Sequence, residues 1–182
     1  CSVPDWEPFP HLQPRRTIMG APAFPLSEFD KEMASTRRLL ERVPEEKGEW
    51  KPHEKSFPLG HLAQLVARMP GWFPMVLDNS ELDLSGGAGY SFEPTSVLLE
   101  EFDSGVKAAR EALSRVTGDD LDAPWSLTMG DQVMSTQPKG EVARESLRHL
   151  AHHRGQLTVY LRLLDVPIPS IYGPTADEGW SG

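Results

Sequence analysis

Three of the six histidines in this 182-residue chain lie within five residues, inside a helix-forming pattern that runs from about Glu141 to Leu164. In a helix, His149 and His153 are one turn apart on the same side. They lie directly beside an apolar strip, which is formed by Leu150, Leu157, Leu161 and Leu164. A long helix with one apolar side has to be covered by other elements, so this segment constrains the fold more than any other.

Three further segments repeat apolar residues every three or four positions, which predicts three more helices. They run from Ser27 to Pro44, from Pro58 to Met69, and from Thr95 to Val116. The second is predicted to stop at Pro70-Gly71 and the third at Thr117-Gly118, because these residues are typical of helix ends.

The segments between these helices show no convincing sheet. Residues 78–94 are predicted to form a surface loop, and residues 119–140 an irregular segment with a short hairpin or a lid. The patterns therefore predict an all-α fold, a four-helix bundle over residues 26–166 with long irregular loops. A proline-rich N-terminal arm, residues 1–25, precedes the bundle and an extended tail, residues 167–182, follows it.

The charge of the chain narrows the possible partners. The formal net charge is −9 and no basic stripe is present, which argues against a nucleic-acid partner.

No apolar run of about 18 residues exists that could span a membrane. The single cysteine, Cys1, excludes an internal disulfide framework. No signal-peptide pattern is visible, so the chain is expected to be cytoplasmic.

His149 and His153 are candidate metal ligands. Their Cβ atoms lie roughly 5–6 Å apart in a helix, so both rings can converge on one point inside a bundle. The alternative is that each ring packs at the edge of the core with its N–H satisfied by another group, which is the commoner role of a single helical histidine. Spacing alone leaves both interpretations open.

Two motifs resemble the DinB-like (DinB/YfiT) superfamily. The first is His-Leu-Ala-His-His-Arg-Gly-Gln-Leu, which begins at His149, and the second is Tyr172-Gly173-Pro174 followed by Asp177-Glu178. The stretch Pro52-His53-Glu54-Lys55-Ser56 is also similar to that superfamily. The resemblance covers about residues 26–178.

The resemblance implies an up-down-down-up four-helix bundle that is usually a homodimer. It also implies a divalent metal, zinc or nickel, bound by one histidine of the second helix and by the pair His149 and His153. Relatives with known activity include thiol-dependent transferases and hydrolases, which implies a small-molecule substrate such as a thiol. In such a site the metal activates a water or a thiolate as the nucleophile.

The second helix departs from the pattern of the superfamily. Relatives carry the third histidine at the position that Leu65 occupies in this chain. His61 lies one turn earlier, about 6 Å away along the helix axis. His61 is a candidate third ligand only if the helix slides or the metal shifts, because metal–ligand distances vary by a few tenths of an ångström. Otherwise a carboxylate or water fills the position, or nothing does.

Two functions remain open. One is a metal-dependent hydrolase or thiol transferase; the other is a metal-deficient bundle that acts as a non-catalytic dimeric binding or structural protein, for which Leu65 argues. Gln156, Tyr160 and His152 are candidates to orient the ligands or to contact substrate, and simple packing is the alternative. Arg154 is expected to face away from the histidine pair and to pair with an acidic residue. The tail is expected to pack on the bundle or on a partner subunit.

Overall fold

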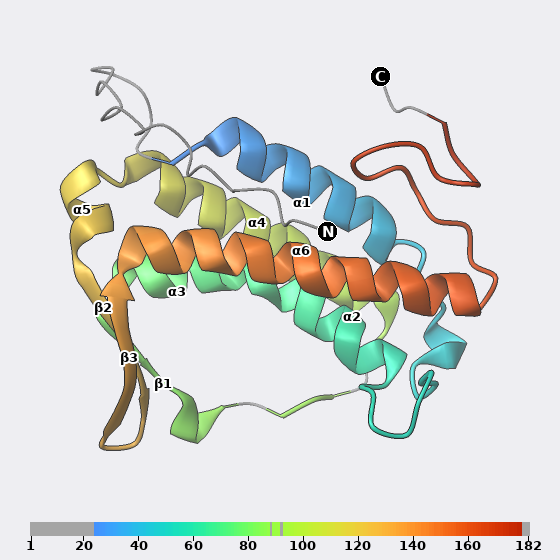
Figure 1. Cartoon of the computed structure of the whole chain (residues 1–182), viewed down its shortest axis with the longest axis horizontal. Helices are drawn as coiled ribbons and strands as arrows, with labels where there is room; N and C mark the ends of the chain where they lie inside the picture. Colours follow the sequence, from blue (N-terminus) through green and yellow to red (C-terminus); the bar gives the residue numbers. More distant parts are fainter. Residues whose placement is uncertain (1–23, 88, 92, 180–182) are drawn as a thin grey trace, which may run out of the picture.

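The computed structural model describes residues 24–87, 89–91 and 93–179, and the fold within these ranges is mostly helical. The α-helices are α1 (Leu26–Leu40), α2 (Leu59–Arg68), α3 (Trp72–Asp78), α4 (Thr95–Arg115), α5 (Gly118–Asp122) and α6 (Lys139–Leu163). In Figure 1, α1 and α6 run in one direction, whereas α2, α3 and α4 run in the opposite direction. The long helices pack against one another around one core.

The apolar sides of these helices meet in the core, as the three- to four-residue periodicity predicts. Fully buried members include Phe29 and Leu39 of α1, Leu62 and Val66 of α2, Phe102 and Leu113 of α4, and Leu150 and Leu157 of α6. Thr36 interrupts the apolar pattern of α1 but is also buried. Its hydroxyl donates to the backbone oxygen of Glu32 at 2.7 Å, which satisfies the polar group inside the core.

The predicted end of the second helix near Met69 is confirmed, but the chain stays helical beyond that point. α2 ends at Arg68, but Met69–Gly71 form a 3₁₀ turn, η2, and α3 follows at once. Proline is tolerated because it stands at the start of the turn, where its missing N–H is not needed. Gly105 of α4 allows close packing here, since a Cβ at this position would lie 3.2 Å from the backbone nitrogen of Gly71.

The mostly helical fold is confirmed, but it is not purely α-helical, because a small three-stranded sheet is also present. Its strands are β1 (Glu81–Asp83), β2 (Pro124–Met129) and β3 (Gln132–Pro138). β2 and β3 form an antiparallel hairpin with a bulge between Leu127 and Thr128, which confirms the hairpin, one of the two alternatives for residues 119–140. β1 lies within the predicted surface loop and pairs with β2 in parallel. Such a short polar strand is defined by a distant partner, which no local pattern reveals.

The first helix begins one residue before the predicted Ser27 and ends at Leu40 instead of Pro44. The third and fourth predicted helices, which correspond to α4 and α6, lie where the periodicity predicts them. Except for Phe24 and Pro25, the predicted N-terminal arm lies outside the described residues. No helix in the described ranges is both long enough and apolar enough to cross a membrane.

The C-terminal tail folds back onto its own chain. The Asp177 carboxylate pairs with Arg162 of α6 and accepts a hydrogen bond from the backbone N–H of Ile168 at 2.9 Å. Glu178 pairs with Arg38 of α1. Because these contacts join the tail to the first and the last helices, the tail covers one end of the helical core.

Candidate functional site

The pair His149 and His153 lies on α6, and its two rings point toward each other. Their Nε2 atoms are 2.8 Å apart, which is a hydrogen-bond distance. The Nδ1 of His153 lies 2.7 Å from Oε1 of Gln156. A carbonyl oxygen only accepts, so His153 carries its proton on Nδ1 toward Gln156. In the neutral pair, His149 then donates from Nε2 to Nε2 of His153.

The pair lies at the flank of the helical core and not inside it. His149 is exposed and His153 is half-buried, whereas Leu150 and Leu157 hold the centre of the buried strip. Partial burial and the neighbouring His153 and His152 lower the pKa of His149 below its ordinary value of 6.5. His149 is therefore favoured in its neutral form at neutral pH. The prediction that both rings aim into the interior is wrong in this respect.

His61 does not join the pair. Its ring stacks on Tyr90, with centroids 4.8 Å apart, and also contacts Phe57 at 4.3 Å. Burial lowers its pKa as well. The aromatic neighbours pack around the ring in this place, one turn away from Leu65, where the resemblance implies a third histidine. Leu65 occupies that position and packs against the core with a side chain that cannot bind metal.

The residues present do not fit a three-histidine metal centre. In the described ranges no three His, Cys, Asp or Glu side chains come together closely enough to hold a metal ion. Two nitrogens bound to one tetrahedral zinc at about 2.0–2.1 Å lie about 3.3 Å apart. The 2.8 Å between the Nε2 atoms instead matches a direct hydrogen bond. The chain supplies two ligands where catalytic zinc sites commonly use three.

A mostly apolar cavity of about 540 Å³ opens beside His149, between α3, α6 and the sheet. Its wall consists of Trp72, Val76, Leu82, Leu84, Trp125, Leu127, Ser135, Gln137, Val142, Glu145, Ser146 and His149. The Trp72 and His149 rings lie 5.4 Å apart at this wall. The volume and lining are typical of a site for a small organic molecule.

Sequence analysis found His149 but missed the rest of this cavity. Its far wall comes from the sheet, and β1 in particular is distant in sequence from α6. The one local signal is Trp125 and Leu127, two large apolar residues at alternate positions in the segment that forms the hairpin. A third apolar residue, Val142, stands at a position of α6 that periodicity places beside the histidines.

A second, more polar cavity of about 390 Å³ adjoins His153. Gln156 and Tyr160 line it together with residues of the loop before α2, among them Lys55 and Phe57. The Tyr160 hydroxyl donates to the backbone oxygen of Phe57 at 3.2 Å, so this residue fastens the loop to α6. His152 is exposed, and its ring lies 5.0 Å from the ring of His153. Of these three candidates, only Gln156 hydrogen-bonds to the pair.

Arg154 faces away from the histidine pair, as expected, and is 1% exposed. Its guanidinium donates to the carboxylate of Glu32 at 2.5 Å, to the hydroxyl of Thr36 at 3.0 Å and to the hydroxyl of Tyr172 at 2.5 Å. The tail residue Tyr172 also donates to Glu32 at 2.9 Å. This buried cluster joins α6, α1 and the tail, so its role is structural.

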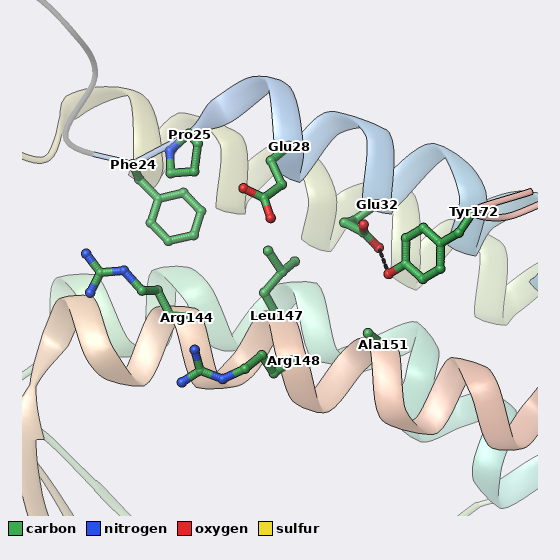
Figure 2. Close-up of a pocket in the computed structure, with 9 residues that line it drawn as sticks. All are labelled: Phe24, Pro25, Glu28, Glu32, Arg144, Leu147, Arg148, Ala151 and Tyr172. Carbon is green, nitrogen blue, oxygen red and sulfur yellow. Dashed lines mark hydrogen bonds between the residues drawn. The ribbon is translucent and has the colours of Figure 1, made fainter. Parts of the chain in front are cut away.

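A groove between α1 and α6 lies beside this cluster. Figure 2 shows Glu28 and Glu32 on α1 across from Arg144 and Arg148 on α6, with Tyr172 at one end. The groove is smaller, at about 280 Å³, and mixes both charges over an apolar floor. It lies on the side of α6 that faces away from the histidines. Of the three cavities described, the histidine pair therefore borders the other two.

Comparison with known proteins identifies others with a similar fold. No family model matches the chain. The uncharacterized protein YrdA of Bacillus subtilis (strain 168) is 25% identical over 155 residues, which cover 84% of this chain and 89% of that protein.

Two solved structures are similar to the described chain. A DinB-like protein from Bacillus cereus ATCC 10987 superposes with a TM-score of 0.61 and 21% identity, covering 81% of this chain and 95% of the other. The DinB-like protein YjoA from Bacillus subtilis also gives a TM-score of 0.61, with 18% identity, covering 77% and 91%. The chain therefore has the fold of the DinB-like proteins.

Proposed function

We propose that this chain is a member of the DinB-like superfamily, with an up-down-down-up bundle at its centre, that binds a small, mostly apolar molecule in the cavity beside His149. The observation that carries the proposal is the cavity itself, which combines an apolar wall with one convergent polar pair. Pockets of this kind bind the body of a ligand by apolar contact and orient it through a few polar groups.

The histidine pair fits the orienting role. In its neutral form the pair holds one Nε2–H between two rings, and the outer ring, His149, lines the cavity. A ligand hydroxyl or amine can hydrogen-bond to the imidazole of His149, whose tautomer is coupled to that of His153. The arrangement thus offers a polar anchor that needs no metal.

A metal-dependent hydrolase or thiol transferase is the second candidate. The convergence of the two Nε2 atoms favours it, as does the Gln156 contact, which puts the proton of His153 on Nδ1 and its lone pair on Nε2, on the side of His149. A zinc or nickel ion would have to take its other ligands from a second chain or from a bound molecule such as a thiol. Leu65 argues against it, since that residue removes the third histidine.

Elemental analysis distinguishes the two candidates. We expect protein purified without a polyhistidine tag to contain far less than one equivalent of zinc or nickel per chain. About one equivalent that disappears in His153→Ala, but stays in the matched neighbour variant His152→Ala, would support the metal enzyme instead.

Blocking the cavity tests the binding role. A probe such as 2-naphthylmethanol should raise the melting temperature of the wild-type protein, because a ligand of the folded state stabilises it. Val142→Phe places a ring in the cavity and should abolish this shift. The control Val133→Phe makes the same change at an exposed strand position outside the cavity and should retain it. Equal shifts in both variants would contradict the proposed site.

A further inference from the structure

The wall of the cavity beside His149 carries an acidic side chain but no lysine or arginine among the described residues. Among the described residues that line it, Glu145 is the one with a formal charge, and no Lys or Arg belongs to the wall. His149 lies one turn beyond Glu145 on α6. Among the Asp, Glu, Lys and Arg side chains of the described residues, a ligand in this cavity therefore meets one negative charge and no positive one.

Glu145 is available to a ligand. Its side chain is exposed at the wall, and it accepts a long hydrogen bond of 3.4 Å from the amide of Gln137. No basic side chain among the described residues forms an ion pair with it. A cationic group on a ligand would give this carboxylate its first charged partner.

Two indole side chains, Trp72 and Trp125, line the same cavity. Indole is the aromatic side chain that attracts cations most strongly over its face. Trp125 is only 5% exposed, and its ring N–H has no hydrogen-bond partner among the described residues. A tryptophan-lined wall with one carboxylate is suited to an organic ammonium group and its apolar substituent.

We propose that the ligand of this cavity is an amine, carrying an ammonium group beside Glu145 and an apolar or aromatic body against Trp72 and Trp125. The inference rests on the proposed binding function and specifies the chemical class of the ligand. It separates this cavity from a site for anionic molecules, which would place a second negative charge next to Glu145.

Three probes of one shape test the charge preference: 2-naphthylmethylamine, 2-naphthylmethanol and 2-naphthoate, titrated calorimetrically into the full-length protein at neutral pH. We expect the amine to bind about tenfold more tightly than the carboxylate, since it gains one charge interaction at a partly exposed site and avoids another. The neutral alcohol should lie between them.

Two variants test whether the preference for the amine arises from Glu145 and Trp72. Glu145→Gln should reduce the ratio between amine and carboxylate to within about threefold, and the control Glu100→Gln, an exposed residue of α4, should leave it unchanged. Trp72→Leu should weaken the amine more than the alcohol, because the cation–π contribution applies to the charged probe alone.

The outcomes separate this inference from the function on which it rests. If the carboxylate binds as tightly as the amine, or if Glu145→Gln leaves the ratio unchanged, the amine inference is wrong and the binding function stands. If none of the three probes binds, both are wrong.

Discussion

The proposed site depends on a few residues of α6, among them His149 and His153. The spacing of His149 and His153 predicts that their rings meet, and the structure brings their Nε2 atoms to 2.8 Å. The place of His61 could not be predicted, because its ring is held by Tyr90, a loop residue far away in sequence. The burial of Arg154 could not be predicted either. Its side chain is only 1% exposed and pairs with Glu32, and no sequence pattern indicates that an arginine is buried in this way.

Acidification is expected to destabilise the protein partly through His149. Its folded-state pKa lies below 6.5, so the unfolded chain binds the proton first and stability falls as pH drops below about 6.5. His61 acts in the same direction. Melting temperatures between pH 7.5 and 5.5 should fall less in His149→Gln than in the wild type. An equal or steeper fall in the variant would contradict the lowered pKa.

Loss of Arg154 should be costly. Arg154→Met leaves the half-buried Glu32 without its cation and Thr36 without its donor, which should lower the free energy of unfolding by about 3 kcal/mol. The surface pair Arg110–Asp30 provides the control, since Arg110→Met should cost at most about 1 kcal/mol. Urea unfolding measures both, and a similar small loss in the two variants would show that the cluster is not stabilising.

Helices and strands differ in how far their own sequence defines them. α4 and α6 lie where their periodicity predicts, because each carries its apolar strip within one continuous segment. β1 has three residues and is paired with a strand more than forty positions later, so its local sequence reads as a loop. The second helix ends near Met69 as predicted, but the 3₁₀ turn and α3 that follow it pack against α4, and sequence-based stop signals do not include such packing.

The contact between α4 and η2 gives a prediction at this scale. A side chain at Gly105 would meet the backbone of Gly71 and the ring of Pro70, so Gly105→Leu should destabilise the protein by about 2 kcal/mol through overpacking. Ser104→Leu adds the same side chain at the neighbouring exposed position and should change stability little. Thermal or urea unfolding would contradict the contact if the two variants were equally stable.

The cavity beside His149 is formed by helices and strands together, so no single element shows it. The predicted helical core is present, but the cavity exists only because a small sheet closes the space beside α3 and α6. The sequence could therefore indicate the histidine pair but not the apolar wall in front of it. A homodimer remains a proposal, for which the exposed Val159 and Leu163 on α6 offer an apolar surface.

The dimer proposal is tested by the mass of the protein in solution. If these two side chains lie in the interface, the double substitution Val159→Lys with Leu163→Lys should convert a dimer to a monomer, because it buries two like charges on each side. Analytical ultracentrifugation of the wild type and the variant measures this. A wild-type protein that sediments as a monomer at high micromolar concentration would contradict the dimer.

The central claim is that the cavity beside His149 binds a small apolar molecule without the help of a metal. Its most direct measurement is a calorimetric titration of tag-free, chelator-treated protein with 2-naphthylmethanol. We predict saturable binding of one molecule per chain, unchanged when zinc or nickel is added back. Binding that appears only after the metal is restored, or no binding in either condition, would contradict the claim.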